Sequence, residues 1–220
     1  GRIIGNTLID GGAGEAQITC KGGSQSNVIG NYIYQTPGRN RAPGIVIQNA
    51  LATVCKGNII LNPYKRGIWI GGFNVPNDVI IEGNIIENTQ DNGTGFAFAG
   101  PTAGIYLDGD GKNIIVNDNI IADVTNSINT ANVCGIFSTS NKKSLYIEDN
   151  KISLTMGPAI LIAASPIVVQ IKNNQLLSNT SGVVTTTTNG VTNLELINNK
   201  FADTVGSSTV LFSGAVYPAR

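Results

Sequence analysis

The chain has 220 residues, of which 41% are hydrophobic and 13% are charged, and its 14 basic and 14 acidic residues give a formal net charge of zero. Such a composition is typical of a folded protein rather than a disordered one, and zero net charge disfavours nucleic acid or an anionic membrane as the main partner, because both attract basic surfaces. No apolar run reaches the about 18 residues of a membrane span. Histidine is absent, which excludes Ser–His and Cys–His nucleophile systems and most transition-metal sites.

The chain contains three cysteines, Cys20, Cys55 and Cys134. Their number is odd and their spacing does not match a metal site, so we expect them to be small buried hydrophobic residues. A disulfide framework is therefore not expected, which indicates folding in a reducing compartment such as the cytoplasm.

A six-residue motif with asparagine at its second position recurs along the chain. Its copies are GNTLID, GNYIYQ, GNIILN, GNIIEN, DNIIAD, DNKISL, NNQLLS and NNKFAD. Successive asparagines are 24 to 35 residues apart, and most intervals are close to 25. A period of this length is typical of a solenoid, in which each repeat is one coil. The eight asparagines are Asn6, Asn31, Asn58, Asn84, Asn119, Asn150, Asn174 and Asn199.

The positions around each asparagine follow a fixed pattern. The residues two positions after it and three positions before it are apolar in every copy, whereas the position two before it is charged or an amide in the middle copies. This alternation with a period of two predicts β-strands. The residue just before each asparagine is Gly, Asp or Asn, so we expect a left-handed backbone there. We also expect the side chains of Asn58, Asn84 and Asn119 to form a hydrogen-bonded ladder.

A second motif, GIVIQ, GIWIG, GIYLD, GIFST and AILIA in the five middle coils, predicts another short strand in each of them. The copies lie at residues 44–48, 67–71, 104–108, 135–139 and 159–163. Together these strands predict an all-β fold, a single right-handed parallel β-helix of about eight coils. We expect one domain over residues 1–220, with regular coils over 1–201 and a terminal strand or exit segment over 202–220. Because the chain begins inside the pattern, we expect it to be a fragment of a longer one.

The second motif also places aromatic side chains at equivalent, outward-facing positions of successive coils. If Ile68, Ile105 and Ile136 point inward, Trp69, Tyr106 and Phe137 on successive coils point outward. This alternation predicts an exposed apolar stripe, which either receives sugar rings or packs on another chain.

Two insertions interrupt the period, at residues 89–102 and near 123–132. Both leave the rod at the same corner on adjacent coils, and insertions on one face of a solenoid commonly build its binding face. Harmless surface loops are the alternative.

The stretch GIYLDGDGKN, residues 104–113, carries the candidate catalytic acids. Asp108 shares the outward face of Tyr106, and we expect Asp110 or Glu87 to be its partner in acid–base cleavage of a glycoside, which needs two carboxyl groups. The alternative is that Asp108 and Asp110 only form a tight turn, which Asp-Gly pairs favour. The stretch also has a faint likeness to a calcium loop, but the bidentate glutamate is missing, so no cofactor is expected and calcium is only a weak alternative.

Other charged residues lie near this stretch in the predicted coils. Asp91, at the foot of the first insertion, and Lys65 and Arg66, one coil below, are candidate substrate-binding residues. A lyase would need such a cation to neutralise a uronate, so elimination stays open beside hydrolysis. Lys142 and Lys143, one coil above, could serve as well, and Arg39 and Arg41 flank the site two coils below.

Over residues 1 to about 201, the chain resembles the right-handed parallel β-helix of the pectate-lyase-like superfamily. The resemblance is carried by the Gly-Asn-Ile-Ile motif, the asparagine ladder and the coils of short strands. The irregular coils without histidine or disulfides look most like phage tailspike and tail-fibre depolymerases. This resemblance implies a polysaccharide-binding and polysaccharide-cleaving rod of a virion tail or the extracellular space, assembled as a homotrimer with parallel axes. The alternative is a non-catalytic structural or receptor-binding shaft whose aromatic stripe is a subunit interface.

Overall fold

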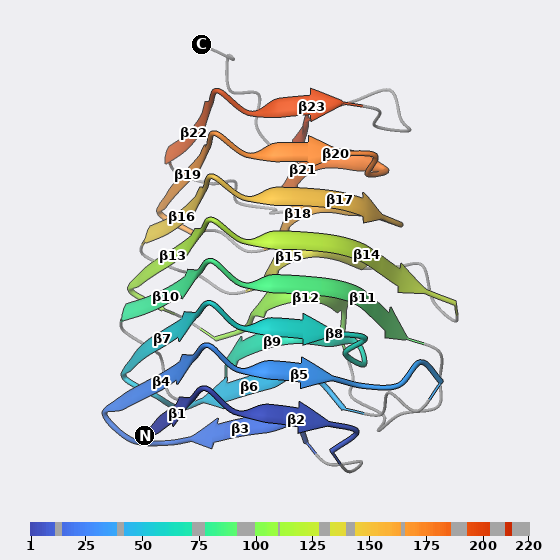
Figure 1. The fold of residues 1–220 in the computed structure, drawn as a ribbon. Helices are drawn as coiled ribbons and strands as arrows, with labels where there is room; N and C mark the ends of the chain where they lie inside the picture. The colour runs from blue at the N-terminus through green and yellow to red at the C-terminus, as the bar shows by residue number, and fades with distance from the viewer. Residues whose placement is uncertain are drawn as a thin grey trace.

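The structure is a computed structural model that describes residues 1–11, 15–38, 42–71, 78–91, 100–109, 111–127, 133–139, 144–163, 166–185, 193–202 and 210–212. Within these ranges all regular secondary structure is β-strand, and the strands form three parallel sheets of eight strands each. The chain climbs from one coil to the next as a right-handed solenoid (Figure 1). The predicted parallel β-helix is therefore confirmed.

Each coil contributes one strand to each sheet, in the order A, B, C. Sheet A consists of β1 (Arg2–Ile4), β4 (Gln25–Ile29), β7 (Ala52–Lys56), β10 (Asp78–Glu82), β13 (Asn113–Asn117), β16 (Ser144–Glu148), β19 (Val168–Lys172) and β22 (Asn193–Ile197). Sheet B consists of β2 (Thr7–Ile9), β5 (Tyr32–Tyr34), β8 (Ile59–Leu61), β11 (Ile85–Asp91), β14 (Ile120–Asn126), β17 (Lys151–Thr155), β20 (Gln175–Leu177) and β23 (Lys200–Ala202). Sheet C consists of β3 (Ile18–Lys21), β6 (Ile45–Gln48), β9 (Arg66–Gly71), β12 (Thr102–Leu107), β15 (Val133–Ser138), β18 (Pro158–Ile162), β21 (Ser181–Thr185) and β24 (Val210–Phe212).

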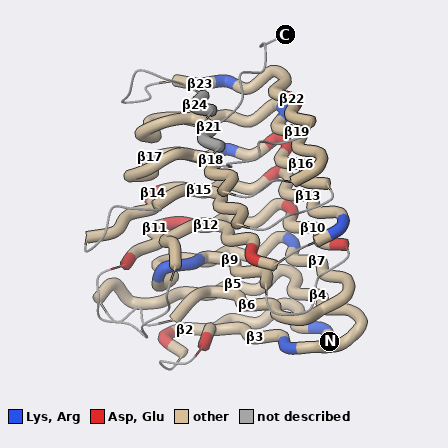
Figure 2. The backbone as a smooth tube through the Cα atoms, turned by 180° about the vertical axis from the view of Figure 1, so that it is seen from behind, with Lys and Arg blue, Asp and Glu red and all other residues tan. Residues whose placement is uncertain are grey.

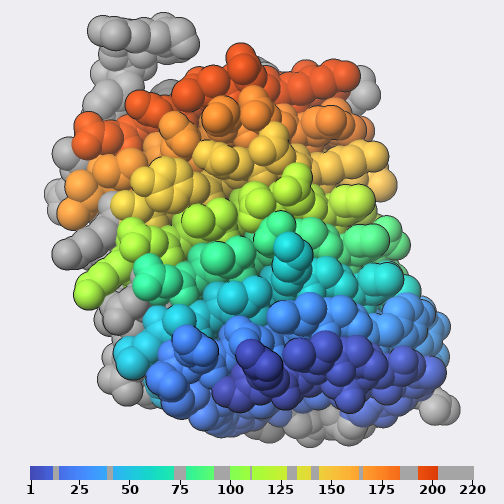
Figure 3. All heavy atoms as spheres, turned by 60° about the vertical axis from the view of Figure 1, so that its left-hand side comes forward, coloured from blue at the N-terminus to red at the C-terminus, as the bar shows by residue number. Residues whose placement is uncertain are grey.

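The inward columns of the three sheets form one continuous core. In the coil that contains Asn84, sheet A contributes Ile81, sheet B Ile86 and sheet C Ile105, and all three side chains are fully buried. Neighbouring coils repeat this arrangement. From outside, the stacked coils appear as successive coloured layers in the space-filling view (Figure 3). Cys55 and Cys134 are free and buried, and burial raises the pKa of both thiols, as expected for inert packing residues.

The second motif begins with glycine in four coils because the backbone of sheet C approaches the side chains of sheet B closely at this position. A Cβ atom on Gly104 would lie 2.4 Å from Cγ2 of Ile121 and 2.9 Å from the carbonyl oxygen of Gly135. Any side chain at this position would collide with the coil above, so the glycine allows the isoleucine to fill the core.

The corner between sheets A and B carries the predicted asparagine ladder. The residue before every ladder asparagine has positive φ, between 52° at Asn198 and 66° at Gly5. Asn58 donates from its backbone N and from Nδ2 to Oδ1 of Asn84, at 3.0 and 2.9 Å, and Asn84 donates in the same way to Asn119. The ladder prediction is confirmed.

Replacing one asparagine inside the ladder is expected to destabilise the whole rod. In Asn84→Ala, the buried backbone N–H of Asn58 loses its acceptor, the carbonyl of Cys55 loses the amide donor of Asn84, and Oδ1 of Asn119 keeps only the backbone N–H of residue 84. We expect the free energy of unfolding to fall by about 3 kcal/mol, measured by urea denaturation. The matched control is Asn113→Ala, which removes one exposed hydrogen bond to Asp78 and should change stability by less than about 0.5 kcal/mol. Equal effects of the two substitutions would contradict the role of the ladder.

Candidate functional site

The predicted aromatic residues do come together on the outer face of sheet C, the near side of the rod in Figure 2. Tyr106 pairs with Trp69 on one side and Phe137 on the other, and the ring centroids are 6.1 and 5.7 Å apart. However, Tyr106 is only 7% exposed and Phe137 only 5%, and they form a second buried cluster with Leu161. The prediction of an exposed apolar stripe is therefore wrong, because alternation decides which side of a strand a residue faces and not whether the same chain covers that side.

Arg66 is part of this covered cluster. Its guanidinium carbon lies 4.3 Å from the ring centroid of Trp69 and 4.6 Å from that of Tyr106, and the residue is 1% exposed. Burial lowers the pKa of the guanidinium, and the nearby Tyr106 and Asp108 partly offset this effect. Arg66 therefore stabilises the aromatic stack as a buried cation, and its position does not suit it to meet a substrate carboxylate.

Asp108 lies directly after β12, beside the aromatic cluster. It is half-buried, its backbone N donates to the carbonyl of Ile70 at 2.8 Å, and its Oδ1 accepts from Oγ1 of Thr139 at 3.3 Å. Asp110 lies outside the described residues, so the structure does not test its pairing with Asp108. Glu87 belongs to sheet B and Asp108 to the end of a sheet C strand, so these two candidate acids lie on different faces of the rod.

Asp91 and Lys65 are held together in a polar network at the corner between sheets B and C. The carboxylate of Asp91 is 3.3 Å from Nζ of Lys65 and accepts a hydrogen bond from the hydroxyl of Tyr64 at 3.0 Å. Nδ2 of Asn126 approaches the same carboxylate at 3.4 Å and donates to Oγ1 of Thr102 at 3.0 Å. Asp91 is buried, so its observed contacts are internal ones that join adjacent coils.

Glu87 lies instead in a shallow groove of about 420 Å³ on the outer face of sheet B. The groove spans three coils, because Glu87 pairs with Leu61 below and Ala122 above. It is lined by Leu61, Asn62, Glu87, Asn88, Ala122 and Asp123. Both acids of the groove, Glu87 and Asp123, are exposed.

A residue with a left-handed backbone in each of these three coils shapes the groove. Asn62, Asn88 and Asp123 have φ of 55°, 57° and 56°, and each lies four positions after a ladder asparagine. Because of this kink, two successive residues, Glu87 and Asn88, are at least partly exposed. Ile86 before them and Thr89 after them are both buried. A strict period of two would turn Asp123 inward, and for this reason it was missed. The column of Asp and Asn four positions after the ladder is the signal that could have found it.

The two acids of the groove come from neighbouring backbone positions. Asp123 follows Ala122, the residue that pairs with Glu87 on the next coil. With strands about 4.8 Å apart and about 3.3 Å per residue, their Cα atoms are separated by about 6 Å. From Cα atoms this far apart, the flexible side chain of Glu87 and the shorter one of Asp123 can adopt either a retaining or an inverting separation.

An apolar platform adjoins the groove on the same face. It consists of the residues just after the ladder asparagines, of which Ile59 is 37% exposed and Ile120 40% exposed, with Ile85 half-buried between them. Tyr32 continues the platform one coil below and is exposed as well. The outer face of sheet B therefore combines a flat apolar surface with carboxylate and amide groups.

Comparison with known proteins does not assign this chain to a family. No protein-family model, no curated protein and no solved structure matches it. In the part of the chain that the structure describes, no group of three or more Cys, Asp or Glu side chains could hold a metal ion, and no helix is long and apolar enough to cross a membrane.

The network around Asp91 is expected to contribute to stability rather than to ligand binding. Replacing Asp91 with Asn removes the buried carboxylate that faces the partly buried Lys65 at 3.3 Å, so we expect the free energy of unfolding to fall by about 3 kcal/mol in urea denaturation. Glu87→Gln, which neutralises an exposed carboxylate, is the matched control and should cost less than about 0.5 kcal/mol. A stable Asp91→Asn protein would contradict the structural role.

The covered aromatic cluster predicts a loss of stability at alkaline pH. Burial raises the pKa of Tyr106 above its ordinary value of 10.0. The unfolded chain therefore loses this proton first, and stability falls as the pH rises from about 10 toward the folded pKa. Denaturation curves of Tyr106→Phe should show a shallower fall over this range than those of the parent. Identical slopes would mean that Tyr106 ionises freely in the folded protein.

Proposed function

We propose that this chain binds a bacterial surface polysaccharide along the outer face of sheet B and hydrolyses it with Glu87 and Asp123. The observation that carries the proposal is the groove on three adjacent coils, in which two exposed carboxylates lie beside an apolar platform. Apolar platforms suit the faces of sugar rings, and amide and carboxylate groups suit their hydroxyls. A rod of stacked coils also repeats this surface along its length, which fits an extended polymer.

Hydrolysis needs one carboxyl group to protonate the leaving oxygen and a second to act as nucleophile or as base for water. Glu87 and Asp123 come from adjacent coils of one sheet, so the rigid ladder behind them fixes their separation. Hydrolysis is preferred here over elimination because two of the expected lyase cations are engaged elsewhere, Lys65 with Asp91 and Arg66 with the aromatic rings. The other basic candidates, Arg39, Arg41, Lys142 and Lys143, lie outside the described residues. Within this proposal the protein is a rod of phage tailspike type, from a virion tail or the extracellular space, and needs no cofactor.

The second candidate is a non-catalytic shaft whose exposed aliphatic residues contact other chains. Ile59 and Ile120 on sheet B and Ile115 on sheet A favour it, because large apolar side chains on a regular surface indicate a partner. In a homotrimer with parallel axes these columns would face the neighbouring rods. The buried aromatic cluster of sheet C no longer serves as that interface, since its own chain already covers it.

The hydrolase proposal is tested with Glu87→Gln and Asp123→Asn. Each substitution preserves shape and removes a charge, and each should lower the release of reducing ends from capsule or O-antigen preparations by about a hundredfold or more. Binding of the uncut polymer, measured by calorimetry, should persist in both. The matched control is Glu148→Gln, which removes an acid from the outer face of sheet A and should leave cleavage unchanged.

Three results would distinguish the candidates. Loss of cleavage in the two groove variants alone supports hydrolysis at this site. Full cleavage in both variants would overturn the assignment of these residues. A parent protein that neither binds nor cleaves any polysaccharide, and that forms closed trimers in light scattering, would favour the shaft.

A further inference from the structure

Two large apolar side chains lie on the outer surface of the rod in the coil directly above Asp123. Leu154 and Met156 flank the buried Thr155, and they are 57% and 45% exposed. β17, which carries Leu154, pairs with β14 below it (Figure 1), and in this register Val124 lies opposite Thr155. Leu154 therefore lies directly over Asp123, one of the two acids of the groove.

The neighbouring coils are polar at both of these positions. The counterparts of Leu154 are Asn88, Asp123 and Ser178, and those of Met156 are Thr125 and Thr180. The two residues, named here the apolar pair, thus form a patch only one coil or about 4.8 Å high. Hydroxyl, amide and carboxylate groups lie above and below it.

The backbone conformation of Leu154 makes a leucine costly at this position. Its φ is 56°, in the same left-handed column as Asn88 at 57° and Asp123 at 56°. Asn and Asp tolerate this conformation, whereas a bulky side chain adopts it rarely because its Cβ crowds the following carbonyl oxygen. The side chain is more than half exposed, so packing offsets little of this cost. A strained residue beside a candidate site indicates a role in binding.

Met156 is fixed at its base by the coil below. Its backbone N–H donates to the carbonyl of Val124 at 3.0 Å, and its Sδ accepts the backbone N–H of Asn126 at 3.4 Å. The thioether therefore lies against the coil that carries Asp123. Methionine is also flexible and polarisable, which suits contact with a small apolar group of a ligand.

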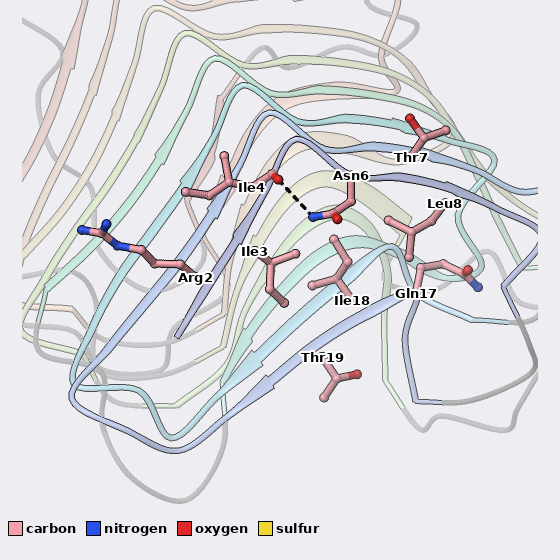
Figure 4. A pocket seen from close by; sticks show the side chains of 9 residues that line it. All are labelled: Arg2, Ile3, Ile4, Asn6, Thr7, Leu8, Gln17, Ile18 and Thr19. Atoms are coloured by element: carbon pink, nitrogen blue, oxygen red, sulfur yellow. Dashed lines mark hydrogen bonds between the residues drawn. The ribbon is translucent and has the colours of Figure 1, made fainter.

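A larger cavity, of about 710 Å³, lies at the first coil and differs in kind (Figure 4). Three of the residues that line it, Ile3, Leu8 and Ile18, belong to the inward columns of the core. This cavity is therefore part of the solenoid interior, whereas the apolar pair lies on the outer surface beside the groove.

We propose that the apolar pair binds a methyl group of the sugar next to the cleaved bond and thereby determines which polymers the groove accepts. A patch one coil high suits one methyl group better than the whole face of a sugar ring, and the polar groups around it suit the ring hydroxyls. The methyl group belongs to a 6-deoxy sugar or to an O-acetyl ester. This inference rests on the proposed function and names the class of polysaccharide within it.

Leu154→Asn gives the specific test, because it introduces the residue type of the column below and relieves the strained leucine. We expect the midpoint of thermal unfolding to rise by about 2 °C. We also expect KM for a methyl-bearing polymer to rise about tenfold, with kcat within about twofold of the parent. Met156→Gln should raise KM in the same way without the gain in stability.

The matched control is Leu51→Asn. Leu51 is 49% exposed and lies between β6 and β7, at the corner between sheets C and A. Its exposure is similar to that of Leu154, but it is remote from the groove on sheet B, so its replacement should leave KM unchanged.

The probes are capsule and O-antigen preparations in matched pairs. One pair compares a polymer with O-acetyl groups with the same polymer after mild alkaline deacetylation, and the other compares 6-deoxyhexose with the corresponding hexose. The parent should bind the methyl-bearing member of one pair about tenfold more tightly, and Leu154→Asn should bind both members equally. The pair that shows the difference identifies the source of the methyl group. Affinities are measured by calorimetry in the Glu87→Gln background.

The outcomes separate this inference from the proposed function. Loss of the methyl preference in a stabilised Leu154→Asn protein supports the role of the apolar pair. A parent without preference in either pair, or a Leu154→Asn protein that keeps the preference, overturns this role and leaves hydrolysis by Glu87 and Asp123 intact. Full cleavage in the groove variants, with a preference that still depends on Leu154, contradicts only the catalytic assignment. A parent that binds no polysaccharide contradicts both.

Discussion

The stacking of one coil on the next through the asparagine ladder is the constraint on which the rest of the molecule depends. At the corner between sheets A and B the chain turns through a left-handed residue, and the asparagine that follows it is buried from Asn31 to Asn174. A single side-chain oxygen, such as Oδ1 of Asn84, accepts both the backbone and the amide N–H of the asparagine below. The corner therefore fixes the register of successive coils, and all three sheets inherit it.

Because the register is fixed, a surface site on such a rod is formed by residues at equivalent positions of successive coils rather than by residues of one coil. A side chain on the outer face of sheet B has its neighbours about 4.8 Å above and below on other coils. In three adjacent coils a left-handed residue four positions after the ladder asparagine interrupts the alternation, and these residues, Asn62, Asn88 and Asp123, line the groove together with Glu87. The same rigidity that stabilises the fold thus sets the separation of the two carboxylates.

Burial distinguishes the two faces that carry chemically suggestive residues. On sheet C, Arg66 is packed against Trp69 and Tyr106, so a cation and two aromatic rings that resemble a sugar site in sequence are largely internal contacts. On sheet B, the acids and the aliphatic platform remain open.

The sequence by itself determined the parallel β-solenoid, the asparagine ladder, the left-handed residue before each asparagine and the inward columns. These features depend on contacts between equivalent positions of successive repeats, so the period alone specifies them, as Asn58, Asn84 and Asn119 show. Only the tertiary structure decided that Tyr106 and Phe137 are covered, that Asp91 is engaged by Lys65, and that Asp123 faces outward beside Glu87. Those outcomes depend on contacts between different columns and on a kink that interrupts the alternation, and an alternation with a period of two specifies neither.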